Sequence, residues 1–260
     1  MKKPNVLVLK TDGINRDEEM ALAFQVAGAE ARIVHVNELR SKRDRFSSYQ
    51  IVVIPGGFAY GDDVASGKIL AVELTSYLGE ELKKFIERKN TLMLGICNGF
   101  QVLVRTGLLP FRWIGEMDVT LTNNVSGHFE CRWIRMRVEN SRCVFLDGLE
   151  GKEVMYPVAH GEGRFFASND VLERVEDEKL VVFRYIDSRG RPTQKYPDNP
   201  NGALHAIGGI TDTTGRILGL MPHPECFVRL EQHPNWRRLK GLKPDGLPLF
   251  QNMVNFAKEA

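Results

Sequence analysis

The sequence predicts an α/β fold, with a central, mostly parallel β-sheet flanked by helices and a small antiparallel addition. Two observations support this fold class. Between residues 6 and 105, short apolar runs alternate with helical stretches. Beyond Pro110 the connections lengthen, and the apolar runs have the character of antiparallel or edge strands. No repeat or low-complexity linker interrupts the chain, so we expect one domain over residues 1–260.

The first part of the chain alternates regularly between the two kinds of element. Residues 17–27 begin with acidic side chains and are closed by Gly28, as expected for a helix. Strand–helix–strand units at this spacing predict right-handed crossovers in a parallel sheet. The expected strands are residues 6–10, 31–36, 50–54 and 91–96, and the expected helices are 17–27, 69–89 and 100–105.

The second part is less regular. Residues 186–203 are rich in Pro, Gly, Asn and Asp and predict a long loop. The expected strands are 119–122, 132–138, 180–185, 205–209 and 217–221, with a final helix at 248–258. Ligands of open parallel sheets bind beyond the carboxyl ends of the strands. We therefore expect the loops after Ile54 and Ile96 to lie together.

Charge and composition exclude several classes of protein. The 35 Lys and Arg residues nearly balance 33 Asp and Glu residues, and this formal charge of +2 does not indicate a nucleic-acid partner. Two basic clusters, residues 42–45 and 237–240, are interpreted as solvated faces and not as phosphate sites. The apolar run at 6–9 is too short for a signal peptide, and no run is long enough to span a membrane.

The four cysteines, at 97, 131, 143 and 226, form no C-x-x-C pair. Without a secretory signal they are expected to be reduced thiols of a cytoplasmic protein. No group of residues has the spacing of a zinc site, so no metal is expected.

The strongest chemical signal is Cys97. Residues 95–99, Gly-Ile-Cys-Asn-Gly, follow a predicted buried strand and precede a helix. This is the pattern of a nucleophile elbow, with glycines where a tight turn brings backbones together. A sulfur at a helix N-terminus is favoured as thiolate. Seen alone, the pattern also fits a buried structural cysteine.

A base for this thiol is predicted at His223. It lies in Met-Pro-His-Pro-Glu (residues 221–225), directly after an apolar strand, between two prolines that restrict the backbone. Glu225 can accept a hydrogen bond from the ring nitrogen that faces away from sulfur. Alone, such an H-x-E pattern is typical of a surface turn. Together with the elbow, it predicts a Cys97–His223–Glu225 triad for acyl transfer.

The third component is Pro55-Gly56-Gly57-Phe58, which follows the third strand. A loop so poor in side chains can direct backbone N–H groups at a developing oxyanion, although it is equally compatible with a simple flexible turn. Three other patterns indicate no site. Residues 61–68 lack the glycine spacing of a phosphate loop, the H-x-E at 160–162 lacks a following P-C-x-x-C, and Cys226 has no elbow.

Taken together, these residues resemble the class I (triad) glutamine amidotransferases. Within that class, the chain is similar to the amidotransferase subunits of phosphoribosylformylglycinamidine synthases, which act in de novo purine biosynthesis. The resemblance covers nearly the whole chain. The matching stretches are 55–62 (PGGFAYGD), 95–101 (GICNGFQ), 107–110 (GLLP), 157–163 (PVAHGEG), 196–202 (YPDNPNG), 221–225 (MPHPE) and 245–250 (DGLPLF).

The resemblance implies a flavodoxin-like core and a glutaminase that passes ammonia to a separate synthase subunit. It implies ATP and Mg²⁺ on that partner, no cofactor in this chain, and in many cases a small assembly subunit. It also implies that backbone N–H groups of Phe58 and Asn98 hold the oxyanion, and that Gly57, Asn98 and Gln101 help hold glutamine. Three positions depart from the usual pattern: Arg16 replaces a common Cys, and His128 and Cys226 each replace an Arg.

Two alternatives stay open from the sequence. The chain could be another elbow-cysteine enzyme, such as a peptidase, a γ-glutamyl hydrolase or a member of the chaperone–deglycase group, although that group has His directly after the cysteine, where this chain has Asn98. It could also be a scaffold protein with an idle triad, against which the intact Cys–His–Glu set argues.

Overall fold

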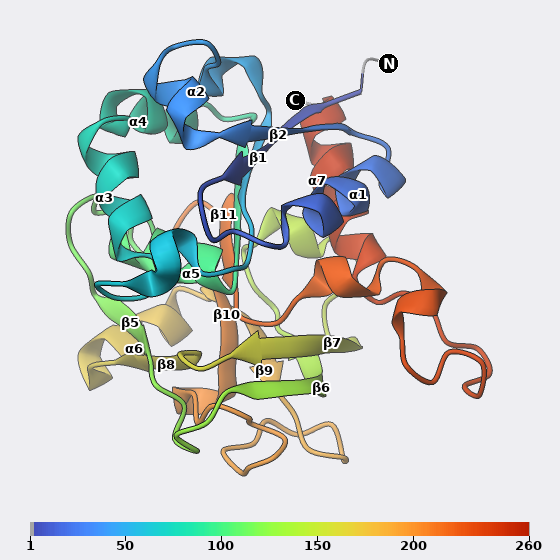
Figure 1. The fold of residues 1–260 in the computed structure, drawn as a ribbon. Helices are drawn as coiled ribbons and strands as arrows, with labels where there is room; N and C mark the ends of the chain where they lie inside the picture. Colours follow the sequence, from blue (N-terminus) through green and yellow to red (C-terminus); the bar gives the residue numbers. More distant parts are fainter. Residues whose placement is uncertain (1–2, 260) are drawn as a thin grey trace.

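The computed structural model describes residues 3–259 and is built around a mixed nine-stranded sheet (Figure 1). The strand order is β2-β1-β3-β4-β11-β10-β9-β6-β7. The pairs from β2 to β11 are parallel, and the pairs from β11 to β7 are antiparallel. This arrangement confirms the predicted α/β class with a mostly parallel centre and an antiparallel extension.

The parallel part consists of short strands whose side chains are mostly buried, because helices cover both faces. Its strands are β1 (Asn5–Lys10), β2 (Glu30–His35), β3 (Ile51–Ile54), β4 (Leu92–Ile96) and β11 (Ile217–Leu220). Figure 1 shows α3 (Lys68–Ser76), α4 (Gly79–Glu87) and α5 (Asn98–Arg105) on one side of these strands. On the other side lie α1 (Asp17–Val26) and α7 (Leu247–Glu259), where Phe24 and Phe250 meet edge to face at 5.0 Å.

The antiparallel part belongs to the second half of the chain. It comprises β6 (Glu130–Val138), β7 (Glu153–His160), β9 (Val181–Tyr185) and β10 (Ile207–Thr211). A separate ladder pairs β5 (Val119–Thr122) with β8 (Arg164–Ala167), and α6 (Asn169–Asp177) follows β8. Neither β7, β8 nor α6 was predicted from the sequence. Alternate residues of β7 are buried, as expected for a strand with only one covered face.

One predicted helix is wrong in extent. The amphipathic stretch 69–89 forms two helices, α3 and α4, separated at Tyr77 and Leu78. Gly79, a poor helix former, begins the second helix, and the buried Leu78 lies at the bend. The bend lets Phe85 of α4 pack against Phe46, with ring centroids 6.0 Å apart. A further short helix, α2 (Val36–Arg40), begins at the end of the predicted second strand.

The main apolar core includes residues of both parts of the sheet, from Val6 in β1 to Tyr156 in β7 and Met253 in α7. Within residues 3–259, no helix combines the length and the apolar character that crossing a membrane requires. The core places the carboxyl ends of β3, β4 and β11 next to one another, since β4 lies between the other two.

Candidate active site

Cys97 lies on a sharp turn between β4 and α5. Its backbone has φ 52° and ψ −107°, a left-handed φ that is unusual for any residue other than glycine. A Cβ at position 99 would lie 1.9 Å from the carbonyl oxygen of Ile54, and one at position 95 would lie 2.5 Å from the carbonyl oxygen of Gly99. Only glycine fits at either position, so the structure contains the strained turn that the spacing predicts.

His223 and Glu225 follow β11, the strand that neighbours β4. The ring nitrogen Nδ1 of His223 lies 2.6 Å from Oε1 of Glu225, and both side chains are buried. The other ring nitrogen, Nε2, is buried without a hydrogen-bond partner among the described residues. Gly56 lies between this ring and the elbow: a Cβ there would be 2.7 Å from Cε1 of His223 and 3.4 Å from Cβ of Cys97. The structure thus places the predicted thiol, imidazole and carboxylate together.

The charge state of His223 follows from its neighbours. Burial alone lowers the pKa of this imidazole, but the Glu225 carboxylate and the interaction with Cys97 outweigh burial and raise the pKa to about 10. The ring therefore holds a proton on both nitrogens at neutral pH. An imidazolium beside the sulfur is the environment that stabilises a reactive thiolate.

The two predicted oxyanion donors differ in their surroundings. The N–H of Asn98 lies in the first turn of α5, where helix N–H groups have no partner within the helix. The N–H of Phe58 instead donates to the carbonyl of Gly13 at 2.9 Å. The loop after β1 lies against the loop after β3, through a bridge between Ile14 and Gly57. In this conformation the Phe58 N–H is not free, which the sequence did not reveal.

A pocket of about 180 Å³ opens beside Cys97. Three residues that are expected from the sequence to hold glutamine or the oxyanion, Gly57, Phe58 and Gln101, line it. The remaining lining residues are Asp62, Ser66, Phe129, Ala159, His160, Gly161 and Glu162. The lining contains two carboxylates and no Lys or Arg, which suits a ligand that carries an ammonium group.

The side-chain amides of Asn98 and Gln101 form hydrogen bonds that hold α5 to the neighbouring loops. The amide nitrogen of Asn98 donates to Oδ1 of Asp62 and to Oε1 of Gln101, both at 3.1 Å, while its oxygen accepts from the N–H of Ala59 at 3.1 Å. The amide of Gln101 donates to the carbonyl of Glu162 at 2.7 Å. The two amides therefore connect α5 to both walls of the pocket.

One wall of the pocket, the end of β7 and the turn that follows it (residues 159–163), was missed from the sequence. Its Ala159 carbonyl lies 3.6 Å from Sγ of Cys97. His160 is buried and bonds through Nδ1 to Oδ1 of Asn124 at 3.2 Å. Burial, and next the charge of His223, lower the pKa of His160 to about 3, so it stays neutral. The family resemblance at 157–163 contained the signal, but the H-x-E there was interpreted only as a possible zinc pattern.

Arg16 and Cys226, two of the three residues that depart from the family pattern, are near enough for their charges to interact. Burial lowers the pKa of the Arg16 guanidinium, but the nearby Cys226, Glu19 and Glu225 raise it overall. Arg16 thus forms an ion pair with Glu19 and lies near enough to Glu225 for the two charges to interact. His223, Glu225 and Cys226 also bring potential metal-ligand atoms within 4.8 Å of one another. Because His223 and Glu225 already bond to each other, the absence of a metal stays our prediction.

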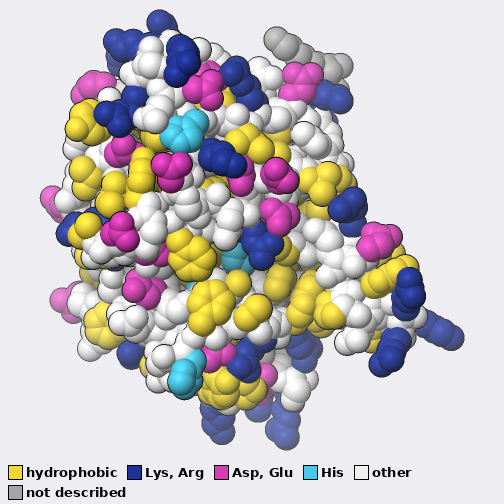
Figure 2. Space-filling model, viewed as in Figure 1, with side chains coloured by type: hydrophobic (Ala, Val, Ile, Leu, Met, Phe, Trp, Pro, Cys, Tyr) yellow, Lys and Arg dark blue, Asp and Glu magenta, His cyan; other side chains and the backbone are white. Residues whose placement is uncertain are grey.

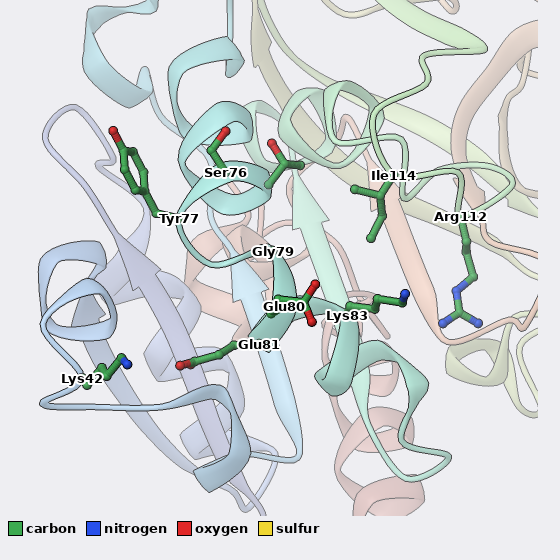
Figure 3. A pocket seen from close by; sticks show the side chains of 10 residues that line it. Lys42, Ser76, Tyr77, Gly79, Glu80, Glu81, Lys83, Arg112 and Ile114 are labelled. Carbon is green, nitrogen blue, oxygen red and sulfur yellow. The ribbon is translucent and has the colours of Figure 1, made fainter.

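A larger hollow of about 660 Å³ lies elsewhere and contains none of the predicted site residues (Figure 3). Tyr77, between α3 and α4, and Lys83 of α4 line one part of it, and Arg112 and Ile114 line another. Its charged residues have both signs, and no cysteine or histidine is among them. Cys97 lines the smaller pocket and not this one.

Comparisons with known proteins agree with this geometry. The fold and the elbow cysteine define a class I glutamine amidotransferase. A family model described as CobB/CobQ-like glutamine amidotransferase domain matches residues 3–257. The chain is 46% identical, over the full length of both proteins, to phosphoribosylformylglycinamidine synthase subunit PurQ of Dehalococcoides mccartyi. It is 42% identical to subunit PurQ of Methanococcus maripaludis, with 97% of each chain covered.

Among solved structures, the chain resembles one in "Structure of PurLQS from Thermotoga maritima", with a TM-score of 0.75 and 31% identity over 98% of this chain and 99% of that one. Another glutamine amidotransferase from Thermotoga maritima shares the fold at 15% identity, with a TM-score of 0.52 over 100% of this chain and 94% of that one. The chain therefore belongs to the glutamine amidotransferase family and, within it, to the PurQ subunits of phosphoribosylformylglycinamidine synthase.

Proposed function

We propose that Cys97, His223 and Glu225 form the catalytic triad with which this chain, the glutaminase component of phosphoribosylformylglycinamidine synthase, hydrolyses glutamine for purine biosynthesis. The observation that carries the proposal is the buried 2.6 Å contact of His223 with Glu225, next to a cysteine held in a strained elbow. The strained backbone at Cys97 lowers the stability of the fold locally, and strain of this kind is typical of a nucleophilic site.

The first half of the reaction forms an acyl-enzyme. The Cys97 thiolate attacks the side-chain carboxamide carbon of glutamine, which forms the C–S bond and moves an electron pair onto the oxygen. His223 then donates its proton to the amide nitrogen, the C–N bond breaks, and ammonia leaves a glutamyl thioester. Glu225 orients the ring and stabilises its charge throughout.

The second half returns the enzyme to its starting state. His223, now neutral, removes a proton from water, and the water oxygen attacks the thioester carbon. The C–S bond then breaks, the new carboxyl group of glutamate gives its remaining proton to water as the product leaves, and Cys97 is again a thiolate beside a protonated imidazole. Protons and electron pairs balance in each half with these three side chains and water alone.

The oxyanion is proposed to bind to the backbone N–H groups of Asn98 and Phe58. One such donor is typically worth about 3–4 kcal/mol in the transition state. The Phe58 N–H can contribute only after it leaves the Gly13 carbonyl, so this half of the oxyanion site has to form when glutamine or a partner binds. Gly57, Asn98 and Gln101 are proposed to hold glutamine, and Asp62 and Glu162 to attract its α-ammonium group.

The ammonia is proposed to pass to a separate synthase subunit that binds ATP and Mg²⁺, within a complex that also contains a small assembly subunit. The names of the relatives, which are synthase subunits, support this assignment. We propose a single domain over residues 1–260, since the main apolar core draws on both halves of the chain. We place the reaction in the cytoplasm, in keeping with four unpaired cysteines, and propose neither a nucleic-acid nor a membrane partner.

The test separates the two activities of the complex, the release of ammonia from glutamine and the use of ammonia in amidine synthesis. With the synthase subunits present, Cys97→Ala should abolish glutamine-dependent synthesis of the amidine, while synthesis from added ammonium salt continues at the wild-type rate. Cys226→Ser is the matched control and should keep both activities. Glutaminase activity in the Cys97→Ala variant would contradict the assignment. Activity of the lone wild-type chain on folate polyglutamates would favour a γ-glutamyl hydrolase.

A further inference from the structure

One segment of the chain is unused by the proposed chemistry and projects from the body of the molecule. We call residues 229–246 the arm; they lie between the 3₁₀ turn Pro224–Phe227 and α7. Figure 1 shows the arm extending away from the rest of the fold as a long excursion. Every residue from 234 to 241 is exposed, so the tip of the arm packs against little else in this chain.

The base of the arm is held firmly. The side chain of Gln232 accepts from the N–H groups of Val228 and Arg229, both at 2.8 Å, and donates to the carbonyl of Glu225 at 3.2 Å. The ring of His233 is buried, 4.6 Å from Trp133. Across the base, the N–H of Gly246 donates to the carbonyl of Phe227 at 2.9 Å. The base of the arm is therefore fixed to the segment that carries Glu225.

The tip carries charge of one sign. Arg237, Arg238, Lys240 and Lys243 lie in a stretch, residues 232–244, that contains no Asp or Glu. Among the residues that the structure describes, none of these four side chains forms an ion pair. Figure 2 shows dark blue side chains at the outer end of the arm.

Large apolar side chains are interleaved with these cations. Trp236 is 38% exposed and Leu239 is 44% exposed, and the guanidinium of Arg237 lies 5.1 Å from the Trp236 ring centroid. Trp and Arg are the residue types that most often dominate protein–protein interfaces. The combination fits a hollow in another protein that has an apolar floor and an acidic rim.

We propose that the arm is the element by which this chain docks on the ATP-dependent synthase subunit, with its tip seated in an acidic, partly apolar hollow of that subunit. The identity of the partner rests on the proposed function. The Gln232 contact with the Glu225 carbonyl ties the docked arm to the segment that carries His223 and Glu225. The partner that receives ammonia is then anchored to the backbone of the catalytic triad.

The test uses the full chain and the purified synthase subunit. The arm variant is Arg237→Glu/Arg238→Glu/Lys240→Glu, and a second variant, Trp236→Ala/Leu239→Ala, removes the apolar contacts without changing charge. The control is Lys83→Glu/Lys84→Glu/Lys89→Glu, which reverses three cations in and just after α4; Figure 1 shows α4 on the left and the arm on the right. Binding is measured by calorimetry at low and high salt. Labelling of each variant with 6-diazo-5-oxo-L-norleucine checks that the Cys97 pocket is intact.

We expect the charge-reversed arm to weaken binding about 100-fold at low salt and to lose most of the salt dependence of the wild type. The apolar variant should lose affinity at both salt concentrations, and the α4 control should bind like the wild type. Wild-type affinity in both arm variants would overturn the docking proposal alone. No binding by the wild-type chain would overturn the proposed partner as well. Arm-dependent binding of the small assembly subunit or of an RNA oligonucleotide, with synthase affinity unchanged, would also contradict the proposal.

Discussion

The two parts of the sheet contribute differently to the site. The parallel part places Cys97 after β4 and His223 after β11, on neighbouring strands. The antiparallel part contributes the end of β7, where the Ala159 carbonyl faces the sulfur, and the following turn, where the Glu162 carbonyl accepts from Gln101. The parallel part thus carries the reacting groups, and the antiparallel part supplies one wall of the substrate pocket. Changes in the first should lower turnover, and changes in the second should weaken glutamine binding.

The largest of these effects is expected when the carboxylate partner of His223, in the parallel part, is removed. Glu225→Gln should lower kcat/KM for glutamine about 10³- to 10⁴-fold, because the ring loses its orienting and charge-stabilising partner. The reaction needs a protonated His223, whose pKa is raised to about 10 with Glu225 present. Without that carboxylate only the interaction with Cys97 opposes burial, so the pKa of His223 should fall and the alkaline fall of the kcat/KM profile should move to lower pH.

A pH series of steady-state rates measures both effects in the reconstituted complex. Glu173→Gln, in α6 and outside the pocket, is the matched control and should leave the profile unchanged. An unshifted alkaline limb in the Glu225→Gln variant would mean that this carboxylate does not set the charge of His223.

The next effect concerns the elbow itself. Gly99→Ala would place a methyl group 1.9 Å from the Ile54 carbonyl oxygen, so the turn and β3 would have to separate. We expect a loss of about 3 kcal/mol in the free energy of unfolding. Gly79→Ala is the control, since a Cβ there meets nothing within 4 Å, and it should be neutral or slightly stabilising. Urea unfolding compares the two, and equal stabilities would contradict the close approach.

The smallest effect is expected in the antiparallel part. Asn124 donates to the His160 carbonyl at 2.8 Å and accepts from the N–H of Gly163 at 3.1 Å, so it holds the turn that forms the pocket wall. Asn124→Ala should raise KM for glutamine about 10-fold, equivalent to about 1.4 kcal/mol, with a smaller change in kcat. Asn123→Ala, at the exposed neighbouring position, is the control. A fall in kcat at constant KM would contradict the proposal that the parallel part governs turnover and the antiparallel part governs glutamine binding.

The sequence predicted best what depends on local pattern. Cys97 and His223 each follow a short apolar strand, and the glycines and prolines around them restrict the backbone in ways that can be read residue by residue. The parallel strands of the first half were recognised for the same reason. The bend between α3 and α4 was missed because an amphipathic pattern continues through Tyr77 and Leu78, where tertiary packing decides the path of the chain.

The missed parts of the site depend on contacts between distant segments. The bond from the Phe58 N–H to the Gly13 carbonyl joins two loops whose approach no spacing in either one reveals. The wall at 159–163 is held by Asn124 and Asn201, residues that look like ordinary loop polar groups in the sequence. The proximity of Arg16 to Cys226 likewise became visible only in the fold. The family resemblance included residues 55–62 and 157–163 but did not reveal these contacts.

The central claim is that Cys97 alone is the nucleophile, and covalent trapping tests it most directly. The complex is treated with 6-diazo-5-oxo-L-norleucine, digested, and analysed by peptide mass mapping. We predict one adduct, on the peptide that contains Cys97, which is lost in Cys97→Ser and retained in Cys226→Ser. An adduct on Cys131, Cys143 or Cys226, or any adduct that persists in Cys97→Ser, would contradict the account.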